Sequence, residues 1–178
     1  MDKKQTNYAF IDSQNLNLGT SRDVIKKGKK VYTGWKLDYK RFRIYLKDKY
    51  HIEKALLFIG YKPGNEAMYT HLQNMGYVCV FKPTLDLTEG KTKGNVDAEL
   101  VLHSMIEFEN YDRAIIISGD GDFHCLIEYL MQKNKLEKVL VPNEFCYSSL
   151  FEHFSTSENN ILSFVSQLKD KLEYKKRK

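Results

Sequence analysis

Ala114-Ile115-Ile116-Ile117-Ser118-Gly119-Asp120-Gly121-Asp122-Phe123 is the stretch that decides the fold. Its apolar, β-branched beginning predicts a buried strand, and residues 123–131 have the spacing of a helix. Asp120 and Asp122 therefore fall at the carboxyl end of a buried strand, where charge is costly unless a counter-charge is present. A metal ion is the simplest counter-charge. Gly119 and Gly121 are expected to bring the backbone close to the ligand and to adopt positive φ.

The same order of strand and helix recurs along the chain. Four other apolar runs predict strands, at residues 8–11, 54–60, 77–81 and 139–141, with helical patterns between them. Alternation of this kind predicts an α/β fold, a three-layer sandwich in which helices cover both faces of a mainly parallel five-stranded sheet. With the strands counted along the chain, the expected order across the sheet is 3-2-1-4-5, so the first and fourth strands are neighbours.

Composition assigns the remaining segments. Residues 24–35 are rich in lysine and glycine and predict an exposed loop or a small hairpin, whereas residues 84–95 predict a mobile loop. Residues 147–154 and 160–174 are expected to be helical. The whole chain, 1–178, is expected to form one domain, with its core in about 6–165 and a basic helix and tail in 166–178.

Four carboxylates are expected to meet at one edge of this sheet. Asp12 ends the first strand, Asp120 and Asp122 follow the fourth, and Asp97 begins the helix that leads into the fourth. Ligands of open α/β sheets bind at the carboxyl edge where the strand order reverses, and right-handed crossovers bring that helix to the same edge. Hard oxygen ligands of this kind suit Mg²⁺ or Mn²⁺. Mg²⁺ keeps several waters, one of which can attack a phosphodiester.

Three motifs together resemble the NYN domain family, the PIN-like nuclease group that includes the LabA-like proteins. They are Phe10-Ile11-Asp12-Ser13-Gln14-Asn15, Lys93-Gly94-Asn95-Val96-Asp97 and Ser118-Gly119-Asp120-Gly121-Asp122-Phe123. The likeness covers about residues 6–165, and the third motif, in its strand-to-helix setting, is the most specific part. The resemblance implies a PIN-like Rossmannoid fold and metal-dependent ribonuclease activity.

The resemblance also implies roles for individual residues. Asp12, Asp97 and Asp120 match the metal-binding acids of the family, with Asp122 close by. Asn15 would orient substrate or a water, and Ser118 would help to hold the site. One position departs from the pattern, because many relatives carry an acid where this chain has His103. We expect His103 to pair with Glu99 or Glu107 one helical turn away, and its presence can lower activity.

The charge distribution favours a polyanionic partner. The chain carries a formal net charge of +5 at pH 7, and its lysines and arginines concentrate in residues 26–30, 36–49 and 175–178. Such clusters suit the phosphate backbone of RNA. Lys91 and Lys93 are expected to contact substrate beside the acids. Tyr32 and Trp35 could stack on bases, although core or hairpin packing is the alternative for both.

Other features indicate a cytoplasmic protein. No apolar run approaches the roughly 18 residues of a membrane span, and the N-terminus has no apolar signal region. The three cysteines are far apart and lie in apolar runs, which predicts buried thiols without a zinc site.

The sequence therefore predicts an endoribonuclease that uses Mg²⁺ or Mn²⁺ to hydrolyse RNA. The alternative is an RNA-binding regulatory adaptor that keeps the fold and turns over poorly. Single-stranded DNA as a second substrate and homodimer formation stay open. Haloacid-dehalogenase chemistry is disfavoured because it needs an acid at position 14, where the chain has Gln14. A Toprim-type site is disfavoured because it needs Glu where the chain has Asp12.

Overall fold

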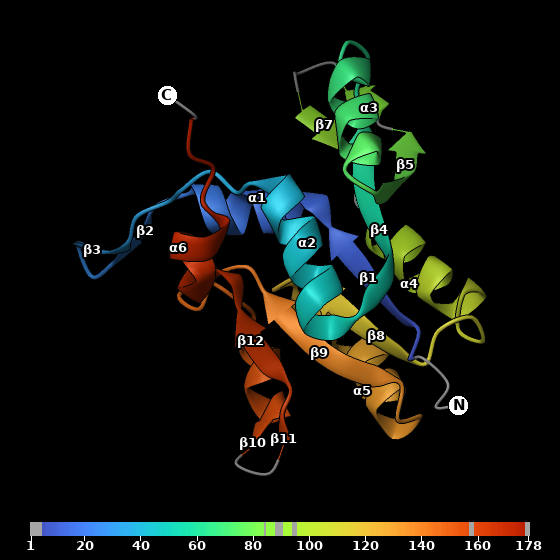
Figure 1. The fold of residues 1–178 in the computed structure, drawn as a ribbon. Coiled ribbons are helices and arrows are strands. Elements are labelled where there is room, and N and C mark those ends of the chain that lie inside the picture. Colours follow the sequence, from blue (N-terminus) through green and yellow to red (C-terminus); the bar gives the residue numbers. More distant parts are fainter. Residues whose placement is uncertain (1–4, 84, 88–90, 94–95, 157–158, 177–178) are drawn as a thin grey trace.

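A six-stranded parallel sheet forms the centre of the molecule (Figure 1). The computed structural model describes residues 5–83, 85–87, 91–93, 96–156 and 159–176. The order across the sheet is β12-β9-β8-β1-β4-β5 and every neighbouring pair is parallel. The strands are β1 (Asn7–Asp12), β4 (Ile52–Tyr61), β5 (Tyr77–Pro83), β8 (Arg113–Ile117), β9 (Leu136–Val141) and β12 (Leu162–Phe164). The predicted α/β fold and the order of its five strands are confirmed.

The sixth strand corrects the sequence prediction. Residues 160–174 were expected to form one helix, but Leu162–Phe164 pairs with β9 at the edge of the sheet. A short apolar run suits a buried strand or a buried helix equally well, and periodicity alone does not separate them. The uncharged residues that follow form a 3₁₀ turn, η3 (Val165–Leu168), and the charged residues begin with the short helix α6 (Lys169–Leu172).

Alternating side chains of β1 build a separate core on each face of the sheet. Tyr8 and Phe10 join a cluster with residues of α4 (Asp97–Ile106) and α5 (His124–Gln132). Ala9 and Ile11 join a second cluster on the opposite face. That cluster includes residues of α1 (Ser13–Ser21), α2 (Tyr39–Tyr50), α3 (Glu66–Asn74) and α6. Two cores separated by one sheet are the three-layer sandwich expected from the sequence.

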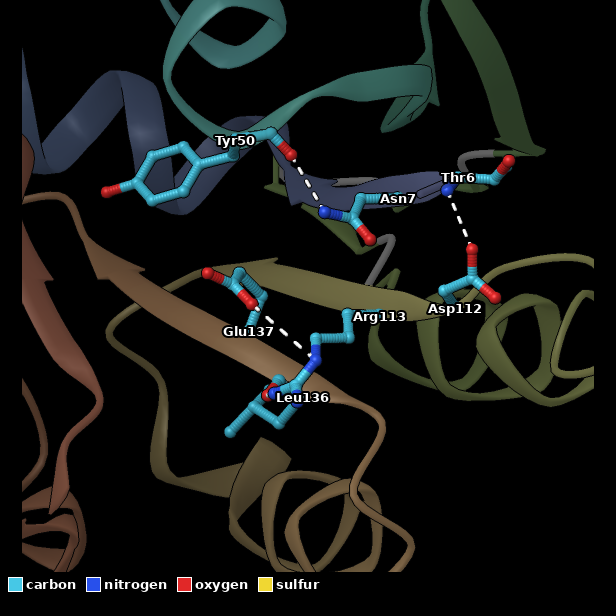
Figure 2. A network of polar contacts seen from close by, with 7 residues as sticks. All are labelled: Thr6, Asn7, Tyr50, Asp112, Arg113, Leu136 and Glu137. Carbon is cyan, nitrogen blue, oxygen red and sulfur yellow. Dashed lines mark hydrogen bonds and ion pairs between the residues drawn. The ribbon is translucent and has the colours of Figure 1, made fainter. Parts of the chain in front are cut away.

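Polar groups at the amino edge of the sheet are bonded to one another (Figure 2). The contacts join β1 to the segments before β4 and β8, and join β8 to β9. They run from Thr6 N to Asp112 Oδ2 (2.8 Å), from Asn7 Nδ2 to Tyr50 O (2.9 Å) and from Arg113 Nε to Glu137 Oε2 (3.8 Å). Charge at this edge is thus paired within the protein.

Small hairpins project from the central layers. Residues 24–35 were expected to form either an exposed loop or a small hairpin. They contain the hairpin of β2 (Val24–Lys26) and β3 (Lys29–Tyr32). Its turn residues Lys27 and Gly28 both have positive φ (48° and 74°), the geometry of a type I′ turn. The prediction of a mobile loop at 84–95 is wrong for residues 85–87 and 91–93, which the structure describes. There β6 (Leu85–Leu87) pairs antiparallel with β7 (Lys91–Lys93). Strands of three residues are too short to give a periodic signal.

Near the C-terminus another short pair forms, β10 (Ser155–Thr156) with β11 (Asn159–Asn160). It follows the 3₁₀ segment η2 (Ser149–Phe154), which replaces the helix expected at 147–154. The prediction that the three cysteine thiols are buried was also wrong, since Cys125 and Cys146 are exposed and Cys79 is half-buried. Among the described residues, no helix has the length and apolar character needed to cross a membrane.

The helix packing makes a stability prediction. Leu46 of α2 is fully buried, whereas Leu102 of α4 is 58% exposed. Leu46→Ala should lower the free energy of unfolding by about 2–5 kcal/mol, because it removes buried apolar atoms and leaves a cavity. Leu102→Ala removes the same atoms from a helix surface and should change it by less than about 0.5 kcal/mol. Urea denaturation of both variants measures the difference, and similar losses would contradict the packing described.

Candidate functional site

The loop after β8 is shaped by its own polar groups. β8 ends at Ile117, and the backbone N–H of Asp120 donates to Ser118 Oγ (3.1 Å). Asp120 then caps the 3₁₀ turn η1 (Gly121–Phe123), because its Oδ1 accepts from the N–H of Asp122 (3.1 Å). The side chain of Asp120 and the backbone of Asp122 are therefore held at the carboxyl edge of the sheet.

Asp12 occupies the matching position on the neighbouring strand. It ends β1 and caps α1, with its Oδ1 accepting from the N–H of Asn15 (3.0 Å). Its Oδ2 accepts from Ser118 Oγ (3.4 Å). Asn15 Oδ1 in turn accepts from the N–H of Gly119 (2.8 Å). The loops that follow β1 and β8 are thus tied together by side chains from each.

Three of the four predicted acids form a compact cluster. Asp97, Asp120 and Asp122 each present a carboxylate oxygen, and these oxygens lie within 4.8 Å of one another. Asp12 is outside this tight group, but with Asp97 and Asp120 it lines one cavity of about 720 Å³. The four carboxylates predicted to share a crevice are therefore near neighbours, with Asp12 set deeper than Asp122.

The cluster has the electrostatics of a cation site. Asp12 is only 5% exposed, and burial raises the pKa of its carboxyl group, with the charges of Asp97 and Asp120 raising it further. Hydrogen bonds from Asn15 and Ser118 oppose this rise. Within the part of the chain that the structure describes, the ion pairs do not include Asp12, Asp120 or Asp122. Carboxylate oxygens gathered in this way fit Mg²⁺ or Mn²⁺.

Comparison with known proteins identifies the family. The NYN domain profile matches residues 8–158. The chain belongs to the NYN domain family. It is 28% identical over 134 residues to the low amplitude and bright protein LabA of Synechococcus elongatus, a match covering 70% of this chain and 67% of LabA. NYN domains are PIN-like and are generally nucleases, which indicates a nuclease-type function directed at nucleic acid.

A solved structure shares the architecture. The crystal structure of a protein of unknown function from Vibrio parahaemolyticus superposes with a TM-score of 0.67 at 22% identity. The match covers 97% of this chain and 98% of that one. At this identity the likeness concerns the fold alone.

The glycines of the third motif act differently from the prediction. Neither Gly119 nor Gly121 is among the residues with positive φ. Instead, a Cβ at Gly121 would lie 2.4 Å from Ser148 Oγ, and one at Gly119 would lie 3.2 Å from Tyr147 Cβ. The absent side chains therefore let the segment before η2 pack against the acidic loop of the NYN domain.

His103 also differs from the prediction. Its ring lies 5.7 Å from that of Phe58, centroid to centroid, on the face of the sheet covered by α4. The acids expected to pair with it bind lysines instead, Glu99 with Lys82 (3.0 Å) and Glu107 with Lys54 (2.9 Å). Hydrogen bonding by Lys54 is the main cause of the lowered pKa of Glu107, and His103 adds a smaller electrostatic contribution.

The basic and aromatic predictions have mixed outcomes. Lys91 and Lys93 belong to β7, but their side chains lie outside the described residues, as does the Gly94-Asn95 part of the middle motif. Trp35 is 4% exposed and belongs to the core, so it is not placed to stack on a base. Tyr32 is half-buried, faces Phe145 and donates from its hydroxyl to Thr20 O (3.0 Å).

Much of the cavity wall consists of residues that the sequence motifs did not indicate. Arg22, Asp23 and Ile25 at the base of the β2–β3 hairpin line it, as do Asn143 and Cys146. Asn143 is 1% exposed, its Nδ2 donating to Gly19 O and its Oδ1 accepting from Phe145 N. A signal for Asn143 did exist, because it follows β9 at the same carboxyl edge as the acids.

Asp12 gives a prediction about pH. A carboxyl whose pKa is raised by folding favours the folded state most when protonated, so its ionised form costs stability above the folded-state pKa. In EDTA at pH 7, Asp12→Asn should therefore raise the melting temperature. The gain should disappear as the pH falls through the folded-state pKa toward the ordinary value near 3.8.

Thermal melts between pH 4 and 8 measure this effect. The exposed Asp48→Asn on α2 is the matched control and should show no such gain. A lower melting temperature for Asp12→Asn at pH 7 would mean that the hydrogen bonds from Asn15 and Ser118 outweigh the burial and repulsion.

Proposed function

We propose that this NYN domain is a Mg²⁺- or Mn²⁺-dependent endoribonuclease. The observation that carries the proposal is the acidic cluster of Asp97, Asp120 and Asp122, with the buried Asp12 in the same cavity. These four side chains would hold the cation. When bound, the cation supplies charge stabilisation for a phosphoryl group and activation of water for in-line attack. Family membership supports the nuclease class.

The chain's own groups position the reacting atoms. Ser118 Oγ both donates to Asp12 and accepts from the N–H of Asp120, so it holds two acids at a fixed separation. The Oδ1 of Asn15 is committed to the N–H of Gly119, which fixes the orientation of its amide. Nδ2 of Asn15, a residue of the cavity wall, is then the donor offered to a substrate oxygen.

The β2–β3 hairpin supplies the route for RNA. Arg22 and Ile25 at its base line the acidic cavity, and Lys26, Lys27 and Lys29 at its tip are exposed. Figure 1 shows the hairpin reaching out from the body of the molecule beside α1. The hairpin is basic and begins at the cavity lined by the carboxylates. Its positive charge attracts the phosphate backbone of RNA toward that cavity. Lys91 and Lys93 are proposed as further backbone contacts.

An RNA-binding regulator without turnover is the second candidate. The observation that favours it is His103, which packs against Phe58 where many relatives carry an acid. Binding of RNA without cleavage in Mn²⁺ is the result that would select this candidate. Replacing the RNA by single-stranded DNA of the same sequence tests the second substrate, and sedimentation tests the homodimer.

Cleavage tests the metal site. Wild type should cleave a labelled single-stranded RNA in Mn²⁺ and should be inactive in EDTA. Asp120→Asn should lower the rate by at least about 100-fold, since it removes a ligand charge from the cluster. Asp48→Asn makes the same chemical change on the exposed surface of α2 and should keep the full rate. Equal cleavage by wild type and Asp120→Asn would disprove the metal-nuclease proposal.

The hairpin predicts a change in salt dependence. Changing Lys26, Lys27 and Lys29 to Gln should weaken RNA binding in EDTA and flatten the slope of log K against log salt by about 2, at roughly 0.7 for each phosphate that is no longer neutralised. Changing Lys47, Lys49 and Lys133 to Gln removes the same charge from exposed positions at the C-terminal ends of α2 and α5, at the edge of the sheet opposite the acids. Fluorescence anisotropy over a range of salt concentrations measures both slopes. If the two triple variants bind RNA equally weakly, general charge rather than the hairpin steers the RNA.

A further inference from the structure

A second cavity of about 590 Å³ lies beside the acidic one. Leu57 and Ile59 of β4 and Leu72 and Met75 of α3 contribute to its wall, with Gln14 of α1 opposite. Gln14 also lines the acidic cavity, so the two cavities share this residue of their walls. The second cavity is therefore reached from the carboxyl end of β4, next to the strand end that carries Asp12.

The wall of this cavity combines an apolar base with a polar rim. Leu57 and Leu72 are buried, Ile59 and Met75 are partly buried, and Met68 is 46% exposed. The rim offers hydrogen-bonding groups from α1, α3 and the segment before α2, namely Gln14, Asn17, His71, Lys36 and Asp38. A cavity of this size and composition suits a small planar ligand whose edge carries donors and acceptors.

Two tyrosines add aromatic surface to the rim. Tyr39 begins α2, and Tyr174, which follows α6, is 46% exposed. Tyr174 is held in place by its N–H, which donates to Lys36 O (2.8 Å), and by the Lys36 ammonium, 4.6 Å from the ring centroid. Aromatic and thioether surfaces of this kind stack on flat heterocycles.

We propose that the second cavity binds one nucleobase of the RNA strand whose backbone lies in the acidic cavity. The shared wall at Gln14 is what connects the two, because a base and its own phosphate must occupy adjoining spaces. The inference rests on the proposed function for the position of the backbone. The nuclease site would then read one nucleotide next to the cut, and Gln14, Asn17 and His71 would contact the edge of its base.

Methionine methyl groups test occupancy without any need for cleavage. The chain has five methionines, and Met68 and Met75 line the cavity. Met105 and Met131 belong to α4 and α5 on the opposite face of the sheet and serve as internal controls. In EDTA, a short single-stranded RNA should shift the ¹³C-methyl resonances of Met68 and Met75 and leave those of Met105 and Met131 unchanged.

A free mononucleotide gives the second arm of this titration. It should produce the same shifts only at concentrations at least about 10-fold higher, since it lacks the neighbouring phosphates. Equal potency of mononucleotide and strand would overturn the assignment to a strand. Unmoved Met68 and Met75 at saturating RNA would overturn the cavity proposal altogether.

Variants test the energetic consequence. In a series of RNAs that each lack one base, wild type should lose about 10-fold in affinity at one position. Met68→Trp, which fills the cavity, and Tyr174→Ala, which removes part of its wall, should each abolish that position-specific loss. Leu102→Trp adds the same bulk to an exposed site on α4 and should behave as wild type. Retention of the loss in both cavity variants would contradict the proposal.

The two proposals fail separately. Shifts at Met68 and Met75 without cleavage in Mn²⁺ would keep the base site and reject the nuclease. Cleavage that depends on Asp120, with Met68 and Met75 unmoved, would keep the nuclease and reject the base site.

Discussion

The parallel pairing of β1 between β4 and β8 is the constraint on which the site depends. The register pairs Ile11 with Ile117, so the next residues on the two strands, Asp12 and Ser118, lie together at the carboxyl edge. The hydrogen bond between them and the bond from Gly119 to Asn15 then close the gap between the two loops. A shift of one residue in this register would separate Asp12 from Ser118. It would also move each side chain of β1 to the opposite face of the sheet.

The two edges of the sheet handle charge in opposite ways. At the amino edge, Asp112 and Glu137 bind a backbone N–H and an arginine. At the carboxyl edge, carboxylates are gathered, and Asp12 is buried with a pKa raised by its surroundings. The hydrophobic cores on both faces of the sheet supply the stability that lets the second edge remain electrostatically strained. The proposed cation would offset this accumulation of negative charge.

The sequence was sufficient for the parts of the fold set by strong local patterns. The apolar runs predicted five of the six strands, and the rule that ligands bind at carboxyl edges predicted that Asp12, Asp97 and Asp120 share one cavity. The shortest strands were not predicted, because three residues, as in β12 and β7, are too few to show the periodicity of side chains in a strand. The base of the hairpin was not predicted to line the cavity because its position depends on how that loop folds over the edge, whereas Asn143 follows β9 and could have been found by the same carboxyl-edge rule. His103 was misassigned because its helical neighbours pair with lysines on β4 and β5, which helical spacing does not reveal.

The position of β1 has a consequence for how the chain folds. β1 precedes the other five strands of the sheet along the chain, yet one of its two neighbours is β8, and the contact between Asp12 and Ser118, which follows β8, spans 106 positions. Pairing across that separation carries a large loop-closure cost, and folds with such distant contacts form slowly. Until β8 emerges, β1, β4 and β5 can form only half a sheet, in which the backbone N–H and C=O groups along one edge of β1 are unpaired. The acidic pocket cannot form before β8 and the loop after it are in place, and until then the unpaired strand edge favours aggregation.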